Sequence, residues 1–265
     1  MNVLKNRLYS LFQALAIDPR RTWNSFCGIG YYLRTRNDFM RQQRDAPHSE
    51  FRLAGASPCL SDRNDSCGNM QSPYFLQDIL VASRIYKRNP QRHIDVGSRM
   101  DGFIAHVACF RKIEVVDIRE NPFDIPNVSF LQADFMKPLP SMLVESCESV
   151  SCLHALEHFG LGRYGDTVDV EGHVKGLGNL TAILKKGGIL YLSVPIGPQR
   201  IEFNSQRVFS MEYLMSLLNP HFEIECFSYI DDVFCLHENS SLTPESIRTN
   251  FGCHTGCGIF ELVKN

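Results

Sequence analysis

The stretch HIDVGSRMDGFIAH, residues 93–106, decides the fold of this chain. A short apolar strand ends near the acid Asp95, the chain turns at Gly97, and a helical run follows. This strand–turn–helix unit is typical of a binding site for a nucleotide-like cofactor, because its backbone N–H groups converge on the ligand. The turn departs from the usual glycine-rich form at Arg99 and Asp101.

Apolar strands and helices alternate on both sides of this unit. A helix is predicted over residues 73–88. Strands are predicted over residues 92–97, 113–117, 128–133, 149–153 and 187–195. Helices are predicted between and after them, over residues 103–111, 174–186 and 210–218. Two later strand-like runs, 222–228 and 258–264, fit a final antiparallel pair at the sheet edge.

Short buried strands that alternate with helices pair in parallel through right-handed crossovers. We therefore predict an α/β fold: a Rossmann-like, doubly wound, mostly parallel seven-stranded sheet with an antiparallel edge strand. The predicted domain covers residues 71–265, and residues 1–70 form an N-terminal helical or irregular extension or lid.

The extension divides into two parts. Residues 1–17 place apolar side chains at helical spacing, which predicts a helix that either caps the domain or makes weak peripheral contact with a membrane. Residues 18–70 are rich in Arg, Asn, Asp and Ser and are expected to be irregular.

Charge is distributed unevenly along the chain. Residues 1–92 carry 14 Lys and Arg against 7 Asp and Glu, whereas the remainder carries 13 against 22. A basic arm ahead of an acidic domain indicates either an anionic partner or an ordinary solvated basic face. We expect no nucleic-acid partner, because no binding motif accompanies the charge.

Composition points to a globular protein of 265 residues, 44% of them hydrophobic and 21% charged. With no run of about eighteen apolar residues and no signal-peptide pattern, we expect a cytoplasmic protein with reduced cysteines. Cys253 and Cys257 flank His254, but no second pair matches them, and we expect no metal site.

Acids follow three successive predicted strands, at Asp95, Asp117 and Asp134. A single acid at a strand end is often only a turn or helix cap. Three in order predict a cofactor pocket, since ligands of open α/β sheets bind beyond the carboxyl ends of the strands. The carboxylate of Asp117, 20 residues beyond Gly97, suits the two hydroxyls of a ribose, and Asp134 suits an adenine amino group.

Two further stretches carry a family resemblance: SCLHALEHFG, residues 151–160, and LKKGGILYLSVP, residues 184–195. With the acids above, they resemble class I S-adenosylmethionine-dependent methyltransferases. The chain is most similar to a methyltransferase-like group, domain-of-unknown-function family 268, which we expect to be mainly bacterial. The resemblance covers roughly residues 70–265 and includes YFLQDILVA (74–82), LHALEHFGLGRYGD (153–166), YLSVPIGPQRIEFNSQRVFS (191–210) and GIFELVK (258–264).

The resemblance implies S-adenosyl-L-methionine as the cofactor and assigns residues to its parts. The methionine end is assigned Asp95, Gly97 and Ser98. Asp117, with Ile118, is assigned to the ribose, and Asp134 with Phe135 to the adenine. Arg99 either crowds the ligand or pairs with the methionine carboxylate.

The reaction is assigned to the residues after the fourth strand. His154 and His158 would share one helical face if a helix began at His154, and either could take a proton from a hydroxyl. Glu157 could orient a histidine or act as the base. The alternative is that His154 only packs beside the cofactor and that His158 caps or packs. The candidate substrate-binding residues are Arg163, Tyr164, Asp166, Arg200, Asn204 and Arg207.

We therefore expect a methyltransferase that acts on a hydroxyl of a small polar or anionic acceptor, such as a sugar or a surface-polysaccharide intermediate. Two alternatives remain open. An NAD(P)-dependent oxidoreductase would use the same acids, although the first loop retains only the outer glycines of the dinucleotide fingerprint. A non-catalytic binding module would retain the fold without the chemistry, with Arg99 and Asp101 filling the cleft.

Overall fold

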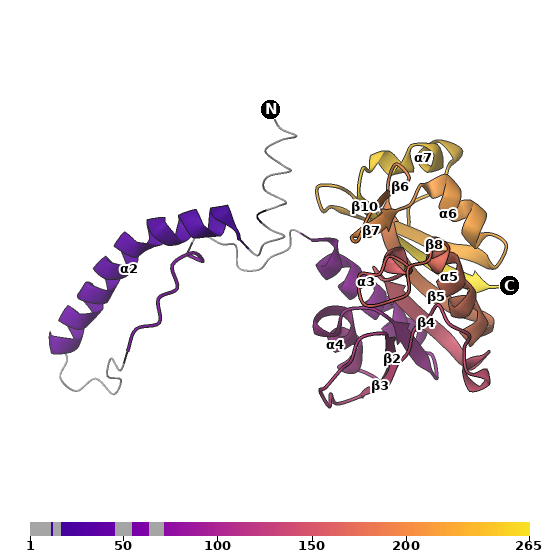
Figure 1. Ribbon diagram of the computed structural model, residues 1–265, viewed down its shortest axis with the longest axis horizontal. Helices are drawn as coiled ribbons and strands as arrows, with labels where there is room; N and C mark the ends of the chain where they lie inside the picture. The colour runs from indigo at the N-terminus through magenta and orange to yellow at the C-terminus, as the bar shows by residue number, and fades with distance from the viewer. Residues whose placement is uncertain (1–11, 13–16, 46–54, 64–71) are drawn as a thin grey trace. The chain divides into compact units, whose positions relative to one another are not determined.

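The chain divides into two compact units, Met1–Asn69 and Met70–Asn265. The computed structural model describes residues 12, 17–45, 55–63 and 72–265 (Figure 1). The helix predicted over residues 1–17 lies outside the described residues, apart from its positions 12 and 17.

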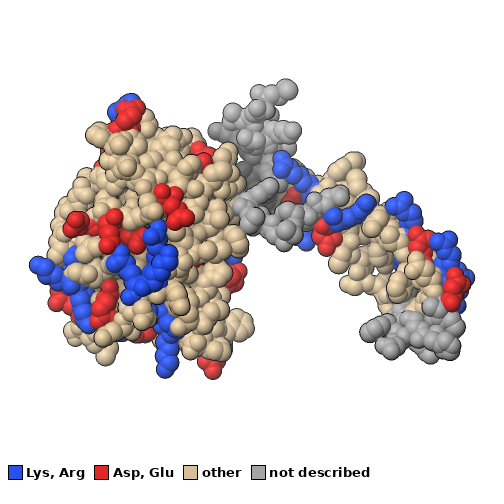
Figure 2. Space-filling model, turned by 180° about the vertical axis from the view of Figure 1, so that it is seen from behind, with Lys and Arg blue, Asp and Glu red and all other residues tan. Residues whose placement is uncertain are grey.

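The first unit contains a helix that the sequence analysis did not predict. Helix α2 (Pro19–Asp45) runs through the segment expected to be irregular. Its start has a local cause: the carboxylate of Asp18 accepts hydrogen bonds from the backbone N–H groups of Arg20 and Arg21, and Pro19 occupies the first turn. Six arginines against two aspartates make α2 basic (Figure 2). No helix among the described residues is long and apolar enough to cross a membrane.

The second unit is built on one eight-stranded sheet of order β3-β2-β1-β4-β5-β10-β8-β9 (Figure 1). Its strands are β1 (His93–Val96), β2 (Ile113–Asp117), β3 (Val128–Gln132), β4 (Cys147–Leu153), β5 (Leu184–Ile196), β8 (Phe222–Ile230), β9 (Leu236–His237) and β10 (Gly256–Lys264). The strands from β3 to β5 are parallel, and β10, β8 and β9 each run antiparallel to the strand before them in the sheet.

The predicted fold class is confirmed: the sheet is mixed, mostly parallel and covered by helices. It has one strand more than predicted, because the two-residue β9 pairs with the end of β8. Such a short strand leaves no periodic pattern in the sequence.

Helices cover both faces of this sheet. Helix α3 (Pro73–Arg88) and the short α4 (Ala105–Ala108) pack on one face through a cluster that includes Ile85 and Val107. Helices α5 (Gly172–Ile183) and α6 (Met211–Leu218) pack on the other face through Leu180 and Leu214. A π-helical turn, η1 (Met100–Ile104), precedes α4 where one continuous helix was predicted.

Shorter elements complete the unit. They are the one-turn helices η2 (Ser141–Leu143), η3 (Leu156–His158) and η4 (Asn250–Gly252), helix α7 (Pro244–Arg248), and the hairpin of β6 (Arg200–Glu202) and β7 (Gln206–Val208).

A buried layer of polar side chains lies on β1 and β4. Nδ1 of His93 lies 2.7 Å from the Ser149 hydroxyl, and Nε2 lies 3.1 Å from the Ser151 hydroxyl. Ser151 donates its proton to Asp95 at 2.5 Å, so its oxygen can accept from Nε2–H of His93. Burial lowers the pKa of His93 to about 3, so the ring is neutral and its Nδ1 accepts from Ser149.

The layer continues into the first loop through Ser98. Its hydroxyl and backbone N–H both donate to the Asp95 carboxylate, at 2.6 and 3.0 Å. The same hydroxyl accepts from the backbone N–H of Leu153 at 3.1 Å. Asp95 and Ser98 therefore fasten the first loop to the end of β4.

We predict that Asp95→Ala lowers the free energy of unfolding by about 3 kcal/mol, because three buried donors lose their acceptor. Asp95→Asn should cost less, since its carbonyl can still accept from both serine hydroxyls. Urea unfolding of the three proteins tests this. Equal stability of the wild type and Asp95→Ala would contradict the structural role.

Candidate functional site

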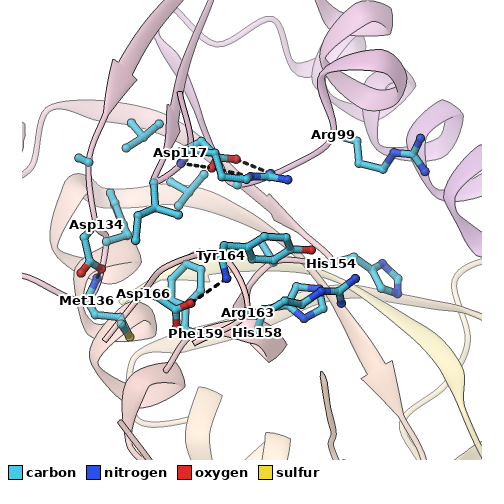
Figure 3. A pocket seen from close by; sticks show the side chains of 18 of the residues that line it. Arg99, Asp117, Asp134, Met136, His154, His158, Phe159, Arg163, Tyr164 and Asp166 are labelled. Carbon is cyan, nitrogen blue, oxygen red and sulfur yellow. Dashed lines mark hydrogen bonds and ion pairs between the residues drawn. The ribbon is translucent and has the colours of Figure 1, made fainter. Parts of the chain in front are cut away.

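A cavity of about 310 Å³ opens at the carboxyl ends of β1 to β4. Figure 3 shows Asp134 and Met136 at one end, His154 and Arg99 at the other, and Asp117 and Tyr164 between them. It is lined by Tyr74, Val96, Gly97, Arg99, Val116, Asp117, Ile118, Arg119, Ala133, Asp134, Phe135, Met136, His154, Ala155, His158, Phe159, Arg163, Tyr164 and Asp166.

The first loop meets the cavity through backbone rather than through its acid. Gly97 has φ +76°, and a Cβ at this position would lie 2.8 Å from the Cβ of Ala155. Both constraints favour glycine. Asp95 and Ser98, expected to contact the cofactor, lie behind this wall and not on it, because their polar groups are used within the buried layer. Their assignment to the cofactor is corrected accordingly.

Arg99 and Asp101, the unusual residues of this loop, pair with each other. Nε and Nη2 of Arg99 donate to the Asp101 carboxylate at 3.1 and 2.8 Å. The guanidinium lies 5.4 Å from the ring centre of Tyr74, and 56% of the Arg99 side chain is exposed. The pair therefore leaves the cavity open, and Arg99 forms part of its wall.

Asp117 lies on the cavity wall as predicted, but its carboxylate already has a partner. Arg119 donates to it from the backbone N–H at 2.8 Å, from Nε at 3.0 Å and from Nη2 at 2.6 Å. The Arg119 guanidinium also stacks 4.6 Å from the ring centre of Tyr164. Arg119 was not among the sequence candidates, although it follows the strand-end acid Asp117 by two residues.

The far end of the cavity is more apolar. Asp134 faces it, with one carboxylate oxygen accepting from the backbone N–H of Met136 at 3.0 Å. Ile118, Phe135 and Phe159 complete this end of the wall. Met136 and Phe159 were not among the sequence candidates, because an apolar lining residue has the same pattern as a core residue.

His154 has an unusual backbone. Its φ is +49°, in the left-handed region that non-glycine residues rarely adopt, and such outliers concentrate at functional sites. The ring lines the cavity, and Nδ1 lies 2.6 Å from Oε1 of Gln77. Burial lowers the pKa of His154 to about 3, so the imidazole is neutral.

The predicted shared helical face of His154 and His158 is wrong. Only Leu156–His158 forms a helical turn, η3, and His154 precedes it with left-handed backbone. Both rings nevertheless line the same cavity. His158 donates from Nδ1 to the backbone oxygen of Ser205 at 2.7 Å, and burial lowers its pKa to about 4.

Glu157 turns away from the cavity. It is fully buried, and neither carboxyl oxygen has a hydrogen-bond partner among the described residues. Its Oε1 lies 3.8 Å from Nε2 of His158. Burial raises the pKa of Glu157 to about 8, so the carboxyl is largely protonated at neutral pH. The structure therefore does not place Glu157 where it could act on a ligand.

The loop after η3 supplies three of the expected substrate-binding residues. Asp166 accepts from the backbone N–H groups of Gly160, Gly162 and Tyr164 at 2.8–3.1 Å and so organises the loop. Arg163 donates to the same Ser205 oxygen that His158 uses, at 3.1 Å. Arg163, Tyr164 and Asp166 all line the cavity.

The other three substrate candidates do not line the cavity, and their assignment is corrected. Arg200 is bound by Glu202, Thr255 and the backbone oxygens of residues 198 and 254. Arg207 is buried and donates to four backbone oxygens, those of residues 157, 159, 169 and 170. Asn204 is exposed in the β6–β7 turn with φ +62°.

A family model described as "Caenorhabditis protein of unknown function, DUF268" matches residues 107–243. The chain belongs to this family. The description names Caenorhabditis and gives no support to the expected bacterial origin. The matched segment begins after the first loop, so it does not contain residues 93–106. No curated protein sequence matches the chain.

Solved structures share the fold at low sequence identity. One is the 1,6-didemethyltoxoflavin-N1-methyltransferase of Burkholderia thailandensis, with bound 1,6-didemethyltoxoflavin and S-adenosylhomocysteine, at 14% identity, 90% coverage of each chain and a TM-score of 0.51. Another is the [4+2]-cyclase SpnF, at 15% identity, 71% coverage of this chain, 81% of the other and a TM-score of 0.50. These similarities show the fold.

The buried carboxyl of Glu157 should make the stability of the protein depend on pH. Between its ordinary pKa of 4.5 and the folded value of about 8, the native protein holds a proton that the unfolded chain has lost. Glu157 therefore costs stability as pH rises through this window. We predict that the Tm of Glu157→Gln minus the Tm of the wild type increases steadily from about pH 5 to about pH 8.

Glu148→Gln is the matched control. A hydrogen bond from Lys185 holds the pKa of Glu148 below its usual value, so this carboxylate stays ionised in both states over the same range. The difference in Tm between this variant and the wild type should stay constant. A Glu157→Gln difference that is also constant would contradict the buried, protonated carboxyl.

Proposed function

We propose that this protein is an S-adenosylmethionine-dependent methyltransferase. The observation that carries the proposal is the order of groups along the cavity. An apolar end with Asp134 suits an adenine, the Asp117 carboxylate suits ribose hydroxyls, and the glycine turn with Arg99 and His154 suits the methionine end. The structure from Burkholderia thailandensis supports it, because that methyltransferase of the same fold contains S-adenosylhomocysteine.

The fold by itself is not sufficient support. SpnF shares this fold and is named as a cyclase, so the proposed function rests on the residues of the site. The cavity of about 310 Å³ is at the lower end of the usual size for small-molecule sites. A ligand can approach the backbone closely at Gly97, because glycine has no side chain.

Arg99 and Arg119 define how the ligand would fit. In the Asp101 pair, Arg99 uses Nε and Nη2, which leaves Nη1 for the carboxylate of a methionine group. Ribose hydroxyls would have to displace Arg119 from Asp117 or share the carboxylate with it, because three of its bonds already come from Arg119.

For the acceptor we propose a hydroxyl of a small polar molecule, with a sugar or a polysaccharide intermediate as the example that the sequence suggested. His154 and His158 are neutral and lie on the cavity wall, so a ring nitrogen can accept a hydrogen bond from the acceptor hydroxyl. Arg163, Tyr164 and Asp166 add polar groups to the same wall. Methyl transfer is an in-line displacement, and positioning of the two reactants should supply much of the rate.

Neither alternative gains support from the fold or the site. In the dinucleotide-binding fold the strand after the fifth is a sixth parallel strand, whereas here antiparallel β10 lies between β5 and β8. Under the hypothesis of a non-catalytic binding module, Arg99 and Asp101 would fill the cleft, but they pair with each other at its edge.

We predict that calorimetry detects binding of S-adenosylhomocysteine to the wild type and that Asp117→Ala raises its Kd at least about tenfold, or about 1.4 kcal/mol. Asp124→Ala, the same change on an exposed loop acid outside the cavity wall, should leave Kd unchanged. No binding of S-adenosylmethionine or S-adenosylhomocysteine by the wild type at millimolar ligand would refute the proposed function.

Arg119→Ala should act in the opposite direction. Removing the guanidinium frees the Asp117 carboxylate for the ribose, so we predict a lower Kd for S-adenosylhomocysteine in the same calorimetry. Weaker binding by Arg119→Ala would show that Arg119 contacts the ligand and does not compete with it.

A further inference from the structure

Behind His154 lies a pair of buried polar side chains that the proposed reaction does not yet use. Gln77 and Asp78, on helix α3, are 1% and 4% exposed. Oε1 of Gln77 lies 2.6 Å from Nδ1 of His154, and Nε2 of Gln77 donates to Oδ1 of Asp78 at 2.9 Å. The three side chains therefore form a chain of hydrogen bonds that leads from the helix to the cavity.

The direction of this chain follows from Asp78. An ionised carboxylate only accepts hydrogen bonds, so the Gln77 side chain must turn its NH₂ group toward Asp78 and its oxygen toward His154. The Ser193 hydroxyl, 2.6 Å from Oε1 of Gln77, is compatible with this orientation because it can donate to that oxygen. Facing an oxygen, Nδ1 of His154 must carry the ring proton.

The other ring nitrogen is then a proton acceptor. None of the described residues forms a hydrogen bond with Nε2 of His154. This atom is also not among the fully buried polar atoms that lack a partner, so it keeps some accessible surface. Since the ring lines the cavity (Figure 3), its unprotonated Nε2 is available to a ligand there.

We propose that Gln77 and Asp78 are positioning residues that hold His154 in its Nδ1–H tautomer, with Nε2 ready to accept the proton of the acceptor hydroxyl. The inference rests on the proposed function for the role of that proton transfer. In the balanced step, the acceptor oxygen forms a bond to the methyl carbon, the sulfur–carbon bond breaks, and the hydroxyl proton passes to Nε2.

Charge supports the same arrangement. Burial raises the pKa of Asp78 to about 6, which still leaves it mostly ionised at neutral pH. When Nε2 gains a proton, the imidazolium donates through Gln77 toward this carboxylate. Tyr74, Ser193 and Cys257 also contact the ring and are uncharged, and His158, which adds to the lowering of the His154 pKa, is itself neutral.

The first loop is shaped to admit Asp78. A Cβ at Gly102 would lie 2.5 Å from Oδ2 of Asp78, so a larger residue there would displace the carboxylate. Glycine at position 102 of this loop is thus explained by the chain of hydrogen bonds behind His154.

Nitrogen NMR of the full chain, with ¹⁵N-labelled histidine, tests the inference without a methyl donor. A protonated and an unprotonated ring nitrogen have well-separated shifts, and His154→Gln identifies the His154 signals among the nine histidines. We expect a protonated Nδ1 and an unprotonated Nε2 in the wild type. A proton on Nε2 of His154 would overturn the inference.

Two variants test the two positions. In Asp78→Asn the new amide can donate or accept, so Gln77 loses its fixed orientation and His154 should become a mixture of tautomers. Asp124→Asn, the same change on an exposed loop, should leave the ¹⁵N shifts of the His154 ring at their wild-type values. Gln77→Met removes the acceptor and should also abolish the Nδ1–H preference. Unchanged tautomers in both Asp78→Asn and Gln77→Met would refute the assignment.

The result separates this inference from the proposed function. Failure to bind S-adenosylmethionine or S-adenosylhomocysteine removes the methyltransferase, whereas the nitrogen shifts report the tautomer in either case. A wild type that binds S-adenosylhomocysteine but carries the proton on Nε2 removes only the positioning role.

Discussion

The Ser98 hydroxyl makes the interaction on which the site depends. It donates to Asp95 and accepts from the backbone N–H of Leu153, so it joins the turn after β1 to the last residue of β4. These two ends hold Gly97 against Ala155 in the cavity wall. Without this hydroxyl the parallel pairing of β1 and β4 would remain, but the two loops beyond it would lose their shared anchor.

Charges around the cavity are balanced within the protein. Arg99 and Arg119 are each held by an acid two residues away, and the imidazoles of His154 and His158 are neutral. The two arginines that a ligand would meet therefore already have partners, and the affinity for these groups reflects exchange of hydrogen bonds rather than relief of unpaired charge.

Strand ends were predictable from the sequence because hydrophobic periodicity and topology act together. Asp117 and Asp134 were found for that reason, and the sheet brings them to one cavity. Side-chain direction was not predictable: Arg207 points into backbone oxygens and Asp95 into a buried polar layer, and only tertiary packing determines this. Helix α2 was missed although the sequence contains its start signal, Asp18 followed by Pro19.

Gln77 and Asp78 show a further limit of single-sequence reasoning. They lie in the middle of a helix that was predicted correctly, where a polar pair is usually taken to face solvent. Their burial becomes visible only once α3 lies against the sheet beside Ser193 and His154.

The left-handed backbone conformation of His154 affects stability and the proposed chemistry in different ways. Glycine would adopt φ +49° without strain, so the backbone at position 154 favours glycine, whereas the hydrogen bond between the ring and Gln77 favours histidine. Selection of this protein for heat resistance alone would weigh these two effects, whereas selection for the proposed methyl transfer should retain the histidine. The two selections would separate what the sheet needs from what its cavity does.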